Sequence, residues 1–158
     1  MKTSTLTLTA ILTLACAGSA LAEGMQVSRN GSREGFIGSG EHFTGTAYVE
    51  PLFAANDPFR SNGGEVTFLP GARSNWHTHP AGQVIVVTGG TGWVQEEGGR
   101  KVVMQAGDVI WTPPGVRHWH GATDTTAVTH IAVQQFKDGE NVIWGEPVSD
   151  EQYAGGTE

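Results

Sequence analysis

Short apolar runs separated by turn-forming residues follow one another from Phe43 to Phe136, and none shows a sustained period of 3.6 residues. Glycine, with 23 residues spread along the chain, supplies the tight turns that many short strands need. The pattern predicts an all-β fold in a single domain, a closed double-sheet barrel or jelly roll over residues 44–146. Strands are predicted over residues 44–53, 65–69, 84–88, 93–96, 100–105, 109–112, 116–120 and 126–136.

Three local patterns refine this prediction. The run 84–88 is continuously apolar, which is typical of a strand buried on both faces, and Pro51 favours an edge position. Residues 54–64 are expected to form a loop that ends in the turn Asn62-Gly63-Gly64. The pair Gly98-Gly99 is expected to form a hairpin turn between two strands.

The segments on either side of the barrel are more polar. Residues 23–43 are glycine-rich and are expected to form an N-terminal arm or an edge strand, with His42 at the surface. Residues 147–158 form an acidic C-terminal tail, in which a short helix is expected over 149–153 with Ser149 as its cap.

The first 22 residues have the pattern of a signal peptide. Lys2 precedes an apolar stretch that is too short to span a membrane comfortably, and Ala20-Leu21-Ala22 is a typical cleavage signal. Cleavage after Ala22 predicts an exported protein, either periplasmic or secreted. A lipoprotein signal at Cys16 is the weaker alternative, because Thr13 stands where a large aliphatic residue is preferred.

Charge and cysteine content exclude several functions. The chain has 9 Lys and Arg against 16 Asp and Glu, a formal charge of −7. An acidic chain without a basic run is a poor partner for nucleic acid or for an anionic membrane surface, so a small-molecule substrate is expected. Cys16 is the only cysteine, so the mature protein would have no disulfide, thiolate ligand or cysteine nucleophile.

A histidine cluster lies in the middle of the chain. His77 and His79 are two residues apart, so on a strand both imidazoles point to the same face. Gln83 follows a Pro-Ala-Gly turn, and His118 follows a Pro-Pro-Gly turn. Three neutral imidazoles and one amide oxygen suit a divalent first-row metal, and the lack of thiolates argues against a structural zinc site.

These residues resemble the two motifs of the cupin superfamily. The first motif, G-x5-H-x-H-x3-E-x6-G, matches from Gly71 to Gly90, with Gln83 in place of the glutamate. The second, G-x5-P-x-G-x2-H-x3-N, matches from Gly107 to His118, with Ala122 in place of the asparagine. The resemblance implies the cupin double-stranded β-helix and makes His77, His79, Gln83 and His118 the metal ligands.

From Phe43 to Tyr153 the chain is similar to small bacterial cupins that include manganese-dependent (R)-selective hydroxynitrile lyases. The shared segments include F-T-G-T, P-G-A-R, H-W-H-G, T-H-x-A-x-Q and the closing D-E-Q-Y. The resemblance implies a metal-dependent carbon–carbon lyase that cleaves or forms cyanohydrins such as (R)-mandelonitrile. Mn²⁺ is the expected cofactor, with Fe²⁺ or Zn²⁺ as alternatives, and a homo-oligomer is expected. His120, His130 and Gln134 would lie beside the metal as catalytic residues.

Two observations bear on the chemistry. Glutamine in place of glutamate removes one negative charge, which makes a bound metal more electrophilic and favours Lewis-acid chemistry. Strand alternation places His130, Ala132 and Gln134 on one face, either toward the cavity or toward solvent, and the cavity is favoured. Two other functions remain open, an oxygen-dependent oxidoreductase such as a quercetinase-like dioxygenase, and a non-catalytic cupin that binds a small molecule.

Overall fold

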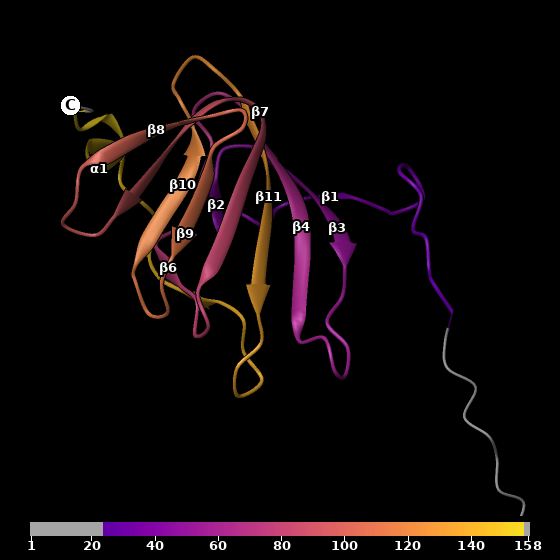
Figure 1. Cartoon of the computed structure of the whole chain (residues 1–158). Helices are drawn as coiled ribbons and strands as arrows, with labels where there is room; N and C mark the ends of the chain where they lie inside the picture. Colours follow the sequence, from indigo (N-terminus) through magenta and orange to yellow (C-terminus); the bar gives the residue numbers. More distant parts are fainter. Residues whose placement is uncertain (1–23, 157–158) are drawn as a thin grey trace, which may run out of the picture.

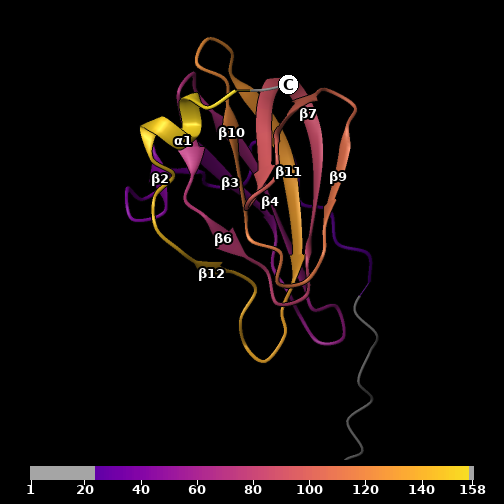
Figure 2. The same cartoon turned by 90° about the vertical axis from the view of Figure 1, so that its left-hand side faces the viewer.

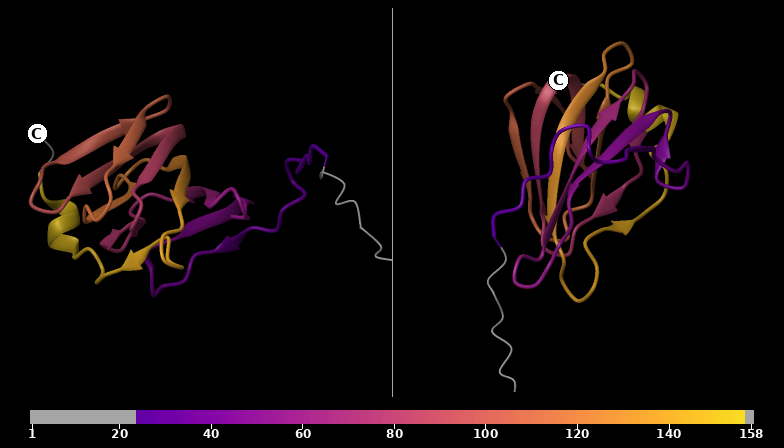
Figure 3. Two further views of the ribbon diagram at one scale, coloured as in Figure 1. Left: turned by 60° about the horizontal axis from the view of Figure 1, so that its bottom comes forward. Right: turned by 90° about the vertical axis from the view of Figure 1, so that its right-hand side faces the viewer.

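The computed structural model describes residues 24–156. The predicted signal peptide, Cys16 and the cleavage point after Ala22 lie outside this range. Within it, residues 24–35 lead away from the folded body (Figures 1 and 3). No helix in the described part of the chain is long and apolar enough to cross a membrane.

The described residues form twelve strands and one short helix, so the all-β prediction is confirmed. The strands are β1 Phe36–Ile37, β2 Phe43–Thr44, β3 Ala47–Phe53, β4 Ser61–Phe68, β5 Arg73–Ser74, β6 His77–Thr78, β7 Gln83–Glu96, β8 Lys101–Gln105, β9 Val109–Thr112, β10 His118–Ala122, β11 Val128–Gln135 and β12 Ile143–Trp144; the helix is α1, Asp150–Ala154.

The long strand β7 joins the two halves of the barrel. Its first half pairs with β9 and β11, and beyond β11 the sheet continues with β4, β3 and β1. Its second half pairs with β8 and β10, and β10 pairs with β5 and β6. The resulting sheet curls on itself, as Figures 1 and 3 show, and encloses the core between its two halves.

Glycines allow β7 to bend where it passes from one half to the other. Gly90 has a φ of +73°, and a Cβ there would lie 2.0 Å from the carbonyl oxygen of Ala127. A Cβ at Gly92 would lie 2.3 Å from the carbonyl oxygen of Gly121. The prediction of separate strands over 84–88 and 93–96 was therefore wrong, because these glycines bend one strand instead of ending it.

The turn predicted at Asn62-Gly63-Gly64 was also wrong. These residues belong to β4, where Gly63 pairs with Val133 and Gly64 pairs with Ala132 of β11. A Cβ at Gly63 would lie 2.5 Å from the ring of Phe53, so the missing side chain makes room for an aromatic ring. The run 84–88 is buried on one face only, because Ile85 and Val87 face the core while the outward side chains are half-buried or exposed.

Two hydrophobic clusters stabilise the barrel. The larger one lies between the sheet halves and includes Phe68, Ile85 and Met104. The smaller one packs Trp76, Trp119 and Val148 against Tyr153 of α1. The predicted helix cap is confirmed, since the Ser149 hydroxyl accepts from the backbone N–H of Gln152 and the Gln152 side chain accepts from the N–H of Ser149.

Candidate metal centre and catalytic cavity

Three histidines from β6, β10 and the residues just after β6 come together inside the barrel. His77 on β6 is paired directly with His118 on β10, and His79 follows β6 by one residue. One ring nitrogen of each of His77, His79 and His118 lies within 4.8 Å of the others. All three side chains are buried. The sheet register therefore brings together imidazoles from positions as far apart in the sequence as His77 and His118, which are separated by 41 positions.

A backbone carbonyl orients each of the three rings. Nδ1 of His77 donates to the carbonyl oxygen of Asn75 at 2.8 Å, and Nδ1 of His79 donates to that of Asn141 at 2.6 Å. Nδ1 of His118 donates to the carbonyl oxygen of Val116 at 3.1 Å. In each neutral ring the proton is then on Nδ1, so Nε2 carries a lone pair that can bind a metal.

The electrostatics also favour neutral rings. Burial lowers the pKa of His118 to about 4 and lowers the pKa of His79. The pKa of His77 is well below its usual value, mainly because the ring is buried and also because His118 lies nearby. A metal ion binds only the unprotonated imidazole, so these rings need not lose a proton near neutral pH.

The arrangement of lone pairs fits a cation. Nε2 of His79 is buried and has no hydrogen-bond partner among the described residues. Nε2 of His118 lies 3.1 Å from Oε1 of Gln83, and with the His118 proton on Nδ1 these two atoms are both acceptors. Two acceptors that face each other without a proton between them are stabilised by a shared positive ion. Gln83, at the start of β7, thus lies with the three histidines as the sequence predicted.

A second pair of histidines lies beside this group. Nε2 of His130 is 3.0 Å from Nδ1 of His120, and both side chains are buried, His130 with 0% of its surface exposed. The ring of Phe68 packs against both imidazoles, with centroids 5.7 Å from each. Burial lowers the pKa of His130 to about 4, and burial together with the neighbouring His130 holds the pKa of His120 well below its usual value.

A cavity of about 170 Å³ opens beside these groups. Its polar wall consists of His77, His79, Gln83, His120 and Gln134. Its apolar wall consists of Phe43, Val49, Val66, Ala132, Val142 and Trp144. Two of the predicted site residues, His118 and His130, lie behind this wall rather than in it. Gln134 and Ala132 face the cavity, so the face of β11 that the sequence favoured is the inner one.

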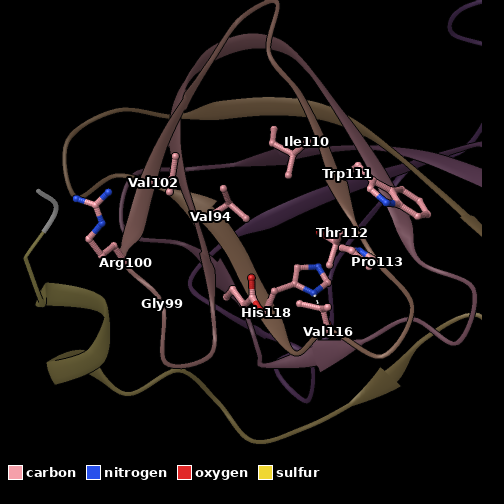
Figure 4. Close-up of a pocket in the computed structure, with 11 residues that line it drawn as sticks. Val94, Gly99, Arg100, Val102, Ile110, Trp111, Thr112, Pro113, Val116 and His118 are labelled. Atoms are coloured by element: carbon pink, nitrogen blue, oxygen red, sulfur yellow. Dashed lines mark hydrogen bonds between the residues drawn. The ribbon is translucent and has the colours of Figure 1, made fainter.

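A larger hollow of about 290 Å³ lies on the other side of His118. It opens between β8 and β9, two strands that each pair with β7 and not with each other. Figure 4 shows His118 with Val94 and Ile110 toward the middle of this hollow, and Arg100 and Trp111 at its sides. Of the histidines described above, only His118 lines this hollow, whereas the smaller cavity is lined by His77, His79 and His120. The smaller cavity is therefore the candidate binding site.

Several site residues carried no signal in the sequence. Asn75 and Asn141 act through their backbone carbonyls, which any residue type supplies. Trp144 reaches the cavity because β12 pairs with β6, a pairing of two residues that sequence patterns do not reveal. His42 was expected at the surface, but its ring is half-buried and stacks on Trp144 with centroids 4.5 Å apart.

Comparisons with known proteins identify the family. The cupin domain model matches residues 64–133. A relative described as (R)-mandelonitrile lyase, from Granulicella tundricola, is 52% identical over 129 residues, which make up 82% of this chain and 98% of that protein.

Solved structures agree with this family assignment. A cupin-like protein from Thermotoga maritima has a TM-score of 0.71 at 36% identity, covering 85% of this chain and 98% of the other. A polyketide cyclase from Streptomyces resistomycificus shares the fold, with a TM-score of 0.64 at 18% identity over 82% of this chain and 91% of the cyclase. The predicted resemblance is confirmed, and the chain belongs to the cupin family.

Proposed function

We propose that this cupin is a metal-dependent lyase that cleaves cyanohydrins such as (R)-mandelonitrile into an aldehyde and cyanide, and that forms them in the reverse direction. The supporting observation is one cavity lined both by His77, His79 and Gln83 of the candidate metal-binding group and by His120, which is hydrogen-bonded to His130 behind it. The 52% identity to a relative described as (R)-mandelonitrile lyase supports the same reaction.

His77, His79, Gln83 and His118 would hold the metal, with Mn²⁺ as the proposed ion and Fe²⁺ or Zn²⁺ as alternatives. A divalent ion held by these residues would supply Lewis-acid chemistry, lowering the pKa of a substrate hydroxyl group. The glutamine contributes no charge, so the protein leaves the full double positive charge of such an ion in place. This donor set favours Lewis-acid chemistry.

His120 is the proposed general base. It lines the cavity, and its Nδ1 faces Nε2 of His130 at 3.0 Å. When Nδ1 donates to His130, Nε2 of His120 carries the lone pair that can accept the hydroxyl proton of the cyanohydrin. His130 then stabilises the positive charge that develops on His120, because the shared proton can move toward Nε2 of His130. The electron pair of the breaking C–C bond leaves with cyanide.

Gln134 is proposed to receive the cyanide. It lines the cavity, and its Oε1 is buried without a hydrogen-bond partner among the described residues. The same amide group carries two N–H donors that can bind the nitrile nitrogen as negative charge moves onto it. The departing cyanide is then protonated by the histidine pair, which returns to its starting state.

The test is cleavage of the separate (R) and (S) enantiomers of mandelonitrile. Protein reloaded with manganese, iron or zinc is compared with metal-free protein, and benzaldehyde release is followed. We expect metal-dependent release with the (R) enantiomer preferred. Oxygen uptake with a phenolic substrate would instead support an oxygen-dependent cupin. Retained metal without turnover of either kind would support a non-catalytic binding cupin.

Two further proposals concern the setting of the reaction. The signal-like segment over residues 1–22 supports export to the periplasm or the medium.

A homo-oligomer is supported by an apolar area on the outer face of the sheet, where β9, β7 and β11 lie side by side. Val109 and Trp111 are 66% and 56% exposed there, beside the half-buried Val84, Val86, Ile131 and Val133. Such an area is typical of a protein interface.

A further inference from the structure

We propose that Trp144, held in place by His42, selects the substituent on the reacting carbon of the substrate and favours a flat aromatic ring over a saturated one. The inference rests on the proposed function for the identity of the reaction. It adds the residue that sets substrate preference, and that residue lies on β12, outside both cupin motifs.

Trp144 is placed next to the metal-binding group by the sheet register. β12 pairs with β6, and Trp144 lies directly opposite His77. The indole and the imidazole have centroids 5.0 Å apart at an angle of 46°, and both side chains line the cavity. A small substrate whose polar group reaches His77 must therefore place its substituent close to the indole. Figure 2 shows the extended segment that carries β12 running beside β6 toward α1.

One face of the indole is already covered. The His42 ring stacks on it with centroids 4.5 Å apart and an angle of 8°. Phe43 meets the same indole edge-on, at 5.7 Å and 67°. These contacts leave the indole little freedom to rotate, so the surface that it presents to the cavity is fixed before a substrate binds.

Asn75 connects the segments that carry His42 and Trp144. Its backbone N–H donates to the carbonyl oxygen of His42 at 2.8 Å, and its side-chain amide donates to the backbone carbonyl oxygens of Glu41 at 2.9 Å and Gly145 at 3.3 Å. Its own carbonyl accepts from Nδ1 of His77. One buried residue therefore fixes His42, the residue after Trp144, and a proposed metal ligand relative to one another.

The cavity itself limits the substituent. Its volume of about 170 Å³ lies below the ~300–1,000 Å³ of ordinary ligand pockets, so it suits one ring and not two. Phenyl and cyclohexyl groups both bury apolar surface in it. A phenyl group also gains the aromatic contact with Trp144, which corresponds to a preference of about three- to tenfold.

The experiment compares mandelonitrile with the cyanohydrin of cyclohexanecarbaldehyde, which differs only in the saturation of the ring. The ratio of the two kcat/KM values is measured for the wild type and for Trp144→Leu, Trp144→Phe and His42→Ala. Because benzaldehyde is a conjugated product, the change in this ratio reports on Trp144: we expect it to fall by at least about threefold in Trp144→Leu, to be largely kept in Trp144→Phe and to be lowered in His42→Ala. Phe59→Leu is the matched control, because Phe59 is exposed and packs on Phe53 outside the cavity.

A binding measurement separates this inference from the proposed function. Calorimetric titration with benzyl alcohol and with cyclohexylmethanol gives a ratio of dissociation constants that needs no turnover. We expect benzyl alcohol to bind at least about threefold more tightly to the wild type and equally tightly to Trp144→Leu. Metal content is checked in each variant, because Trp144 touches His77. No turnover with an intact binding preference would contradict the proposed reaction and leave the inference standing. A Trp144→Leu variant that keeps the preference, or a wild type that shows none, would overturn the inference.

Discussion

Nε2 of His130 lies 3.0 Å from Nδ1 of His120, and the pair is shielded from water by Phe68. A buried imidazole cannot easily take up a proton unless a neighbour shares the charge. Among the described residues, His130 is the only side chain that hydrogen-bonds to Nδ1 of His120, and Nδ1 of His130 has no hydrogen-bond partner. In the proposed mechanism, His130 therefore supports His120 as a base without itself reaching the substrate.

Replacing His130 with alanine tests this role. We expect kcat for mandelonitrile cleavage to fall by about 10²-fold or more, because His120 loses the partner that stabilises its protonated form. Metal content should stay the same, since the ligand group does not include His130. The measurement is turnover at saturating substrate, with elemental analysis of the same samples. Unchanged kcat would remove His130 from the mechanism.

Acid should destabilise the metal-free protein. The folded-state pKa values of His118 and His130 are about 4, below the ordinary value of 6.5, because both rings are buried. Unfolded chains therefore bind more protons, so stability is fully present above about pH 6.5 and is lost as the pH falls toward about 4. Between pH 7 and pH 5 each ring is expected to lower the free energy of unfolding by on the order of 2 kcal/mol.

Urea unfolding of metal-free protein at the two pH values measures this loss. His130→Asn serves as the comparison, because it removes one buried imidazole and should make the loss between pH 7 and pH 5 smaller. Equal unfolding midpoints at pH 7 and pH 5 in the wild type would show that these rings are not kept neutral by burial.

The attachment of α1 gives a prediction about stability. The Arg73 side chain is 6% exposed and donates to the carbonyl oxygen of Val148 at 2.9 Å and to the carboxylate of Asp150 at 2.6 Å. Asp150 has 98% of its side chain exposed, so water screens that ion pair. We expect Arg73→Met to lower the free energy of unfolding by about 2 kcal/mol, through the lost bonds to Val148. Asp150→Ala should cost less than about 1 kcal/mol. Equal losses in chemical denaturation would contradict this division.

The outer face of the sheet gives a prediction about assembly. Placing a charge among Trp111, Val109 and the neighbouring half-buried aliphatic residues should weaken contact between two copies of the chain. We expect Trp111→Glu to shift the molar mass in solution from an oligomer to a monomer, as measured by light scattering after gel filtration. Thr125→Glu, at an exposed position between β10 and β11 and outside this area, is the control for an added charge. A wild type that is already a monomer would contradict the proposed interface.

The fold could be predicted from the sequence because its determinants are local. Alternating side chains, turn glycines such as Gly98 and the Ser149 cap each act within a few residues. The bend in β7 could not be predicted, because Gly90 and Gly92 are required by distant carbonyl groups and not by a local turn. The start of β4 was missed for the same reason, since Gly63 is required by the ring of Phe53.

The candidate site likewise contains residues that the sequence pattern indicated and residues that it did not. His77, His79, Gln83 and His118 have a spacing that indicates a shared metal, and strand alternation favoured the inner face for His130 and Gln134. Trp144 and His42 meet through a two-residue strand and a ring stack, and neither contact leaves a periodic pattern in the chain. The carbonyls of Asn75 and Asn141 depend on backbone position alone, so no side-chain pattern could indicate them.

Metal content is the measurement that tests the central claim most directly. Purified protein is reloaded with manganese, desalted and analysed for metals beside His77→Ala, which lacks one proposed ligand, and His42→Ala, which keeps all four. We expect about one divalent ion per chain in the wild type and in His42→Ala, and less than about a tenth of that in His77→Ala. Wild-type protein that retains no manganese, iron or zinc, or a His77→Ala variant that retains as much as the wild type, would contradict the assignment of this histidine group as a metal centre.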